Sequence, residues 1–330
     1  MDTLSLKIFF LTALSVLSIN FVDAQHQTFV DVGGIDNPSI KNRIDQNASK
    51  LFTEINSAFI NGTIPHLADI EMTADAKSAL FALWETSPFR CLETEIINDA
   101  LFMSTGGIEM RDIRLYMKEA DSSDRNQEGV LVLTKTGVID NLYLAIGTKQ
   151  YRGVMQSGNG VTDMRRREII LNFVENFRTA YNRKDITLLG KVFSEDALII
   201  TGKVIKVLKV EGDMMSRNIP QEKIIYNKQT KSEYLSAMRR IFAANNYINI
   251  KFEELEVVQH GKYPDYYGVT IKQKWNTTRY SDVGYVFLLI DFSNEENPII
   301  HVRTWQPNTI NGKEISKTEV FNIGSFGSLR

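Results

Sequence analysis

Residues 163–198 read DMRRREIILNFVENFRTAYNRKDITLLGKVFSEDAL, and this stretch decides the fold of the second half of the chain. Its apolar side chains recur at helical spacing, which is typical of a helix that packs one face on a core. These side chains are Ile169, Ile170, Phe173, Val174, Phe177 and Tyr181. A polar break at 182–185 and a second apolar run from Ile186 to Phe193 predict a short second helix. The run at 197–201 predicts a strand directly after it.

The pattern continues to Pro307. Residues 203–210 and 222–227 predict the two arms of a hairpin. Thr230 and Glu233 then have the spacing of a capping box, which predicts the start of a third helix. Four runs follow that predict an antiparallel meander: 248–260, 266–275, 284–292 and 299–306. Helices followed by a meander predict an α+β fold, with helices packed on a strongly curved antiparallel sheet.

Residues 163–310 resemble domains of the nuclear-transport-factor-like superfamily, also called cystatin-like. That superfamily includes ketosteroid isomerases and SnoaL-type cyclases. The resemblance rests on 177–185, 192–198 and the closing strand pair at 288–292 and 300–305. It implies a cone whose inner surface can hold a small ligand and whose enzymes use an Asp or His base with a Tyr or Asp donor. No such set of Tyr and paired Asp matches position by position, so the resemblance assigns no isomerase or cyclase residue in this chain.

Two further stretches, 196–205 and 301–307, resemble uncharacterised secreted proteins of Gram-negative gut anaerobes. The first half of the chain, residues 36–155, has a similar order of patterns. Helices are predicted over 40–59 and from Thr73, which can cap the second one. Strands are predicted at 108–117, 129–134 and 138–146. Two interpretations stay open for this half, a duplicated cystatin-like unit and an unrelated small α+β domain.

Composition marks the domain boundary and the ends of the chain. A Gly/Ser/Asn cluster at 156–162 predicts a linker, and 311–330 are expected to form a tail that packs loosely or frays. Residues 1–24 have the pattern of a secretory signal peptide, with an apolar run at 8–22 and small residues before the expected cleavage near Ala24. The alternative is an N-terminal anchor helix, for which the apolar run is short. Cleavage predicts a periplasmic or secreted protein with no membrane span in the mature chain.

Charge and motif content exclude several classes of function. The formal net charge of −2 gives no global attraction to nucleic acid or anionic lipid. The single cysteine, Cys91, is expected to be a small buried residue rather than a reactive thiol. The four histidines are scattered without metal-binding spacing, and no phosphate-binding glycine motif or serine elbow is present. The sequence therefore predicts no metal, no cofactor and no nucleic-acid partner.

The candidate ligand-binding residues are polar and aromatic side chains of the second half. They are Tyr181, Asp196, Tyr226, Trp275, His301, Arg303 and Trp305. The last three share one face of a strand by the two-residue period. If that face is inward, they form a mouth with an imidazole, a cation and an aromatic wall. If it is outward, they form a solvated strand surface or a domain interface. Asp196 fits either a turn or the rim of the cone. No residue is assigned a catalytic role.

Aromatic residues also gather at strand ends and loops, where amphipathic rings suit interfaces. The candidate partner-binding residues are Tyr263, Tyr267 and Tyr280. The first hypothesis is a non-catalytic protein whose curved sheets bind an envelope protein or peptide. The second is a cone that binds a small apolar molecule, and the third is an enzyme of the isomerase or cyclase kind. A homodimer through an open sheet face is compatible with the resemblance.

Overall fold

The computed structural model describes residues 27–104, 106–122, 124–157, 163–208 and 220–326. The chain divides into two compact units, Met1–Ala145 and Ile146–Arg330, and each is described by itself. The expected signal peptide lies outside the described residues, as does most of the expected linker. Within the described part of the chain, no helix is both long and apolar enough to cross a membrane.

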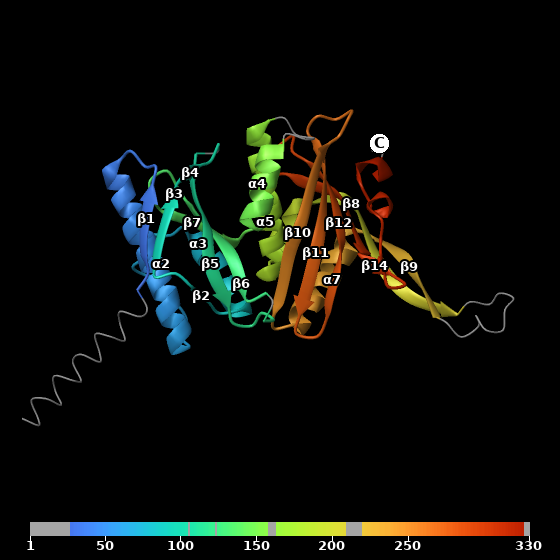
Figure 1. The fold of residues 1–330 in the computed structure, drawn as a ribbon, viewed down its shortest axis with the longest axis horizontal. Coiled ribbons are helices and arrows are strands. Elements are labelled where there is room, and N and C mark those ends of the chain that lie inside the picture. The colour runs from blue at the N-terminus through green and yellow to red at the C-terminus, as the bar shows by residue number, and fades with distance from the viewer. Residues whose placement is uncertain (1–26, 105, 123, 158–162, 209–219, 327–330) are drawn as a thin grey trace, which may run out of the picture. The chain divides into compact units, whose positions relative to one another are not determined.

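The first unit packs two helices on an antiparallel sheet (Figure 1). The helices are α2 (Pro38–Asn61) and α3 (Ala74–Thr86). The sheet runs in the order β2-β5-β6-β7, with β4 beside β5. Its strands are β2 (Phe89–Cys91), β4 (Leu101–Phe102), β5 (Ile108–Met117), β6 (Asn126–Leu133) and β7 (Ile139–Leu144). A separate parallel pair joins β1 (Phe29–Gly33) and β3 (Glu95–Asp99), which the sequence patterns did not predict.

Local contacts explain the helix ends of this unit. Thr73 caps α3, as predicted, because its hydroxyl accepts a hydrogen bond from the Ala76 N–H at 3.1 Å. Gly62 ends α2 in the left-handed region at φ 65°, which glycine adopts without strain. Cys91 is 2% exposed, and burial raises the pKa of its thiol to about 11. The prediction of a buried cysteine is therefore confirmed, and the raised pKa agrees with the expectation that its thiol is unreactive.

The second unit packs four helices on a six-stranded sheet. The helices are α4 (Thr148–Ser157), α5 (Met164–Asn182), α6 (Ile186–Val192) and α7 (Lys231–Ala244). The sheet runs in the order β10-β11-β12-β13-β8-β9, antiparallel throughout except between β13 and β8. Its strands are β8 (Phe193–Leu208), β9 (Pro220–Gln229), β10 (Ile248–Gln259), β11 (Tyr266–Thr277), β12 (Ser281–Asp291) and β13 (Ile299–Pro307). The predicted α+β fold, with helices on a curved antiparallel sheet, is confirmed.

One face of this sheet packs on α5, α6 and α7 and is called the inner face here. The predicted apolar stripe of α5 is buried against it, with Ile170 and Val174 at 0% and Phe177 at 2% exposed. The predicted capping box of α7 is present, because Thr230 and Glu233 bond each other's backbone N–H groups. Helix α4 packs on α5 and β10, so the boundary between the units falls before α4.

A single strand replaces the short strand and first hairpin arm that the sequence predicted. Strand β8 runs through Gly202 without a break and pairs with β9 from Ile199 onward. A Cβ at Gly202 would lie 3.2 Å from the carbonyl oxygen of Trp305, so the glycine permits close pairing with a neighbouring strand. Here the glycine marks a close backbone approach and does not end the strand.

The expectation of a loosely packed tail over 311–330 is wrong for its described part, residues 311–326. After β14 (Thr309–Ile310), this part forms β15 (Lys313–Glu314) and the 3-10 turns η1 (Lys317–Glu319) and η2 (Ile323–Phe326). Phe321, Ile323 and Phe326 pack on the apolar cluster of the opposite, outer face of the sheet. The rings of Phe287 and Phe326 stack at 5.5 Å. The tail therefore covers part of the outer face because it carries apolar side chains of its own.

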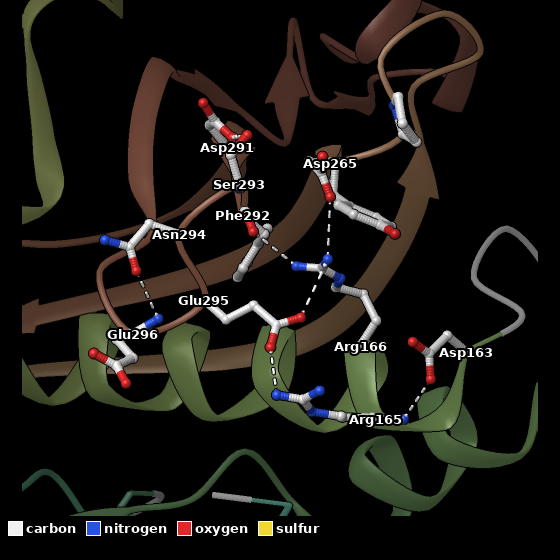
Figure 2. A network of polar contacts seen from close by, with 12 residues as sticks. Asp163, Arg165, Arg166, Asp265, Asp291, Phe292, Ser293, Asn294, Glu295 and Glu296 are labelled. Atoms are coloured by element: carbon white, nitrogen blue, oxygen red, sulfur yellow. Dashed lines mark hydrogen bonds and ion pairs between the residues drawn. The ribbon is translucent and has the colours of Figure 1, made fainter.

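A polar clamp ties the start of α5 to two loops of the sheet (Figure 2). Arg166 donates to the Phe292 carbonyl at 2.9 Å and to Asp265 at 3.1 Å, and pairs with Glu295 at 3.2 Å. Its guanidinium also lies 5.8 Å from the centre of the Tyr267 ring. Arg166 is 14% exposed, so these contacts are partly shielded from water.

Arg166→Ala is expected to lower the free energy of unfolding by about 1–2 kcal/mol, because it removes hydrogen bonds between charged groups. Arg165→Ala is the matched control: Arg165 is 57% exposed and pairs with Glu295 at the surface, so its loss is worth about 0.5 kcal/mol or less. Urea unfolding of both variants measures the difference. Equal effects of the two substitutions would contradict the role given to Arg166.

Candidate functional site

The inner face of the second unit opens into a pocket of about 370 Å³ beside α7. Its lining side chains come from β8, α7, β11, β12, β13 and the loop between β11 and β12. The apolar part of the wall consists of Tyr234, Met238, Ile241, Trp275 and Trp305. The polar groups that reach the pocket include Thr201, Gln273, Tyr280, Asp282 and Arg303. Apolar walls with a few convergent polar groups are the usual composition of a small-molecule site.

Arg303 is the buried cation of this pocket. It is 4% exposed, and its guanidinium lies 4.9 Å from the centre of the Tyr234 ring. Burial alone would lower its pKa, but Tyr234, Tyr181 and Asp282 outweigh that effect and raise it. Its Nε and Nη1 atoms are buried and have no hydrogen-bond partner among the described residues. Unpaired donors of a buried charge are costly, and an acceptor brought by a ligand would satisfy them.

Asp282 is a second polar group whose hydrogen bonding is incomplete. The Tyr280 hydroxyl donates to its Oδ2 at 2.7 Å, whereas Oδ1 is buried and has no partner in the described part of the chain. Burial raises the pKa of this carboxyl, and the Tyr280 hydrogen bond and the charge of Arg303 oppose that rise. Tyr280 is 58% exposed at the lip of the pocket, where burial and the bond to Asp282 raise its pKa.

Gln273 is a third polar side chain of the lining. It lies on β11 and is 3% exposed. The two-residue period of β11 carries apolar residues at Val269 and Ile271 before it and Trp275 after it, all on the inner face. A buried amide at an inward position offers both a donor and an acceptor to whatever fills the pocket.

His301 lies on the opposite face of β13 from Arg303 and Trp305. The two-residue period of a strand had predicted that all three share one face. The pairing of β13 with β12 passes from Val302 to Ile300 and skips His301, which forms a β-bulge. The bulge reverses the alternation, so Ile300, Arg303 and Trp305 lie on the inner face. His301 instead stacks on Tyr266 of the outer face at 5.5 Å. The expected mouth with an imidazole is therefore corrected to a pocket without His301.

The other ligand candidates lie in three different settings. Tyr181 is 1% exposed, with its hydroxyl 2.8 Å from that of Tyr234 and its ring edge-on to Trp275 at 5.9 Å. It therefore supports the pocket from behind. Tyr226 is 42% exposed on β9 and its ring meets Phe321 of the tail at 5.2 Å, which places it on the outer face. Asp196 is exposed and accepts a hydrogen bond from Ser194, which lowers its pKa; it does not line the pocket.

The three partner candidates are also divided. Tyr263 lies in the β10–β11 loop beside His260 and Tyr266. Tyr267 is 4% exposed and packs in the core against Phe292, so the expectation of a surface residue is corrected. Tyr280 belongs to the pocket lip through its bond to Asp282. The aromatic residues at the strand ends therefore do not form one surface.

Asp282 and Gln273 are pocket residues that the sequence analysis did not single out. A signal was present, because Asp282 is in phase with Val286, Leu288 and Ile290, the inward residues of β12. The predicted strand began at residue 284 and left Asp282 in the preceding loop, whereas β12 begins at Ser281. A strand longer than expected therefore carries the carboxylate into the pocket.

Asp282→Asn is expected to raise the melting temperature at neutral pH, because it removes a carboxylate whose burial raises its pKa. A raised pKa in the folded state means that the carboxylate form destabilises the fold above that pKa. This destabilisation is lost as the pH falls through the folded-state pKa toward the ordinary value of 3.8. The gain should therefore shrink in acid, as thermal melts of both proteins across that range would show. A lower melting temperature for the variant at neutral pH would contradict this account.

Comparisons with known proteins give likenesses over less than half of the chain. No protein-family model matches it, and no curated protein matches it. A Bdellovibrio bacteriovorus protein of solved structure is 17% identical over 44% of this chain and 42% of its own, with a TM-score of 0.33. A proposed scytalone dehydratase from Novosphingobium aromaticivorans is 8% identical over 45% of this chain and 88% of its own, with a TM-score of 0.32.

A third similar structure is a proposed dehydratase of the NTF2-like family from Streptomyces avermitilis. It is 12% identical over 42% of this chain and 94% of its own, with a TM-score of 0.29. Some of the similar solved structures are thus described as NTF2-like proteins. At these identities and TM-scores they establish no function for this chain, and the fold described above rests on the strand order of the second unit.

Proposed function

We propose that the second unit is a small-molecule-binding domain whose ligand carries an anionic group. The observation that carries this proposal is Arg303, a buried cation with two unpaired nitrogens in an aromatic-walled pocket. A pocket of about 370 Å³ lies at the small end of the range of roughly 300–1,000 Å³ that is usual for ligand sites. The ligand is therefore a small molecule with an apolar body, held by one charged contact.

We favour the second hypothesis, a cone that binds a small molecule, over the first, a protein that binds an envelope protein or peptide. Two of the aromatic residues considered for partner contacts have other surroundings, since Tyr267 is in the core and Tyr280 bonds Asp282. The sequence predicted a small apolar ligand. Because Arg303 can bind an anion, the proposed ligand has an anionic group as well as an apolar body. We also propose that the protein is secreted to the periplasm or the medium. Only the signal-peptide pattern of residues 1–24 supports this part of the proposal.

Binding without catalysis is the simpler function for this pocket. General acid–base chemistry needs a titratable group placed against a reacting atom. Asp282 is the only acidic residue among the side chains described as lining the pocket, and it holds a hydrogen bond from Tyr280. The resemblance to isomerases and cyclases therefore concerns only the cone-shaped fold. No residue is assigned to a catalytic step.

Tryptophan fluorescence tests the proposal, because two of the three tryptophans of the chain, Trp275 and Trp305, line the pocket. A Trp84→Phe variant removes the third one, which lies in the first unit. Titration of this variant with phenylacetate is expected to give a saturable change in emission. Phenylethanol, a neutral molecule of similar shape, is expected to bind about ten-fold more weakly or worse, because it lacks the charge that Arg303 pairs with. A lack of saturable change with both probes would contradict the proposal.

A further inference from the structure

We infer that the ligand is an aromatic acid that also carries a hydroxyl or amino donor, with its carboxylate on Arg303 and its donor on Asp282. This inference rests on the proposed function and adds a second recognition group to it. It makes Asp282 the residue that selects among aromatic acids. The ligand class follows from two opposite polar groups that the pocket leaves incompletely bonded.

The two groups lie in the same chamber without satisfying each other. Asp282 on β12 and Arg303 on β13 both line the pocket, and each influences the pKa of the other. No ion pair within 4.0 Å joins these two side chains in the described structure. Asp282 keeps a buried Oδ1 without a partner, and Arg303 keeps Nε and Nη1. The pocket therefore offers an acceptor and a set of donors at two separate places.

An indole side chain accompanies each of these polar groups. Trp275 is the residue directly opposite Asp282 in the pairing of β11 with β12. Trp305 lies two residues after Arg303 on the same face of β13, and both line the pocket. Two rings beside two polar groups suit a planar ligand body, because aromatic rings attract one another in stacked and edge-to-face arrangements.

The charges of the lining favour a ligand with a single negative charge. Among the lining residues, the charged side chains are Arg279, Asp282 and Arg303, so two cations face one carboxylate. Arg279 is exposed at the lip and Arg303 is buried, so the buried cation dominates recognition of an anion. The carboxylate of Asp282 repels a second anionic group at its own end and accepts a hydrogen bond from a donor there.

Calorimetric titration of the full chain with three probes tests this inference at mildly alkaline pH, where carboxylates are ionised. The probes are para-hydroxyphenylacetate, phenylacetate and tyrosol, which differ by the hydroxyl and by the carboxylate. The wild type is expected to bind para-hydroxyphenylacetate about ten-fold more tightly than phenylacetate, because the hydroxyl donates to a charged acceptor. In Asp282→Ala this preference is expected to vanish. Asp291→Ala, which removes the outer-face carboxylate of the same strand, is the control that should keep it.

The possible outcomes separate the two proposals. Equal affinity of the wild type for the two acids, with tyrosol weaker than both, overturns the inference about Asp282 and leaves the proposed anion site standing. Binding of tyrosol as tight as that of the acids, or binding of every probe weaker than about 1 mM, overturns both. Preservation of the hydroxyl preference in Asp282→Ala also overturns the inference. If circular dichroism shows that this variant does not fold, Asp282→Asn takes its place and is expected to have a smaller preference than the wild type, because its amide oxygen still accepts a hydrogen bond but carries no charge.

Discussion

Arg303→Met is expected to weaken the binding of an aromatic carboxylate by about 2–5 kcal/mol, roughly thirty-fold or more, with no fall in melting temperature. The guanidinium is buried, and two of its nitrogens have no partner among the described residues. Methionine fills the volume of the arginine stem and needs no hydrogen bond. Replacing a buried charge by an apolar side chain of similar volume is often neutral or stabilising.

Affinity and melting temperature must be measured on the same preparation to separate these two effects. Arg279→Met is the control, because Arg279 lines the exposed lip of the pocket and contributes a charge that water screens. It is expected to change affinity by less than Arg303→Met does. Unchanged affinity in Arg303→Met would remove the basis of the proposed function. A collapse of the fold in this variant would show that Arg303 is structural.

Phe177→Ala is expected to lower the free energy of unfolding of the second unit by about 3–5 kcal/mol, the usual range for a buried phenylalanine. Phe177 is 2% exposed in the middle of α5. Its ring meets Tyr181 at 5.1 Å and Phe193 at 6.0 Å, both edge-on, and so joins α5 to the start of β8. Alanine leaves a cavity there that neighbouring rings cannot fill without leaving their own contacts.

Guanidinium unfolding followed by fluorescence measures this loss. Phe29→Ala is the control, because Phe29 is 62% exposed and its removal is expected to change stability by about 0.5 kcal/mol or less. A loss below about 1 kcal/mol in Phe177→Ala would mean that the core tolerates the cavity or that the ring is not packed as described. The same experiment shows whether the second unit unfolds in one step.

The sequence predicted the long, periodic elements of the second unit well. The stripe of α5, the capping box of α7 and the four strands of the meander follow from side-chain spacing, since burial imposes one period on a helix and another on a strand. The parallel pair of β1 and β3 was not predicted because each strand has only five residues. The single strand β8 was not predicted either. A glycine such as Gly202 is typical both of a break in a strand and of a close approach between two strands, so the sequence does not distinguish them.

Part of the pocket could be predicted and part could not. Arg303, Trp275 and Trp305 were singled out by residue type, and the structure places them together. His301 was grouped with them wrongly, since a single bulged residue moves a side chain to the other face and has no mark in the sequence. Asp282 was missed because the boundary between loop and strand was placed three residues too late. Errors of one to three residues are small for a fold and decisive for a site.

We propose above that the inner face of the second unit holds a small anionic molecule. Native mass spectrometry of the full chain purified from its own host, compared with Arg303→Met prepared in the same way, tests it most directly. A small bound mass on the wild type that is absent from the variant is the predicted result. A stoichiometric protein partner with no small mass, retained equally by both proteins, would contradict the account and support an interaction protein instead.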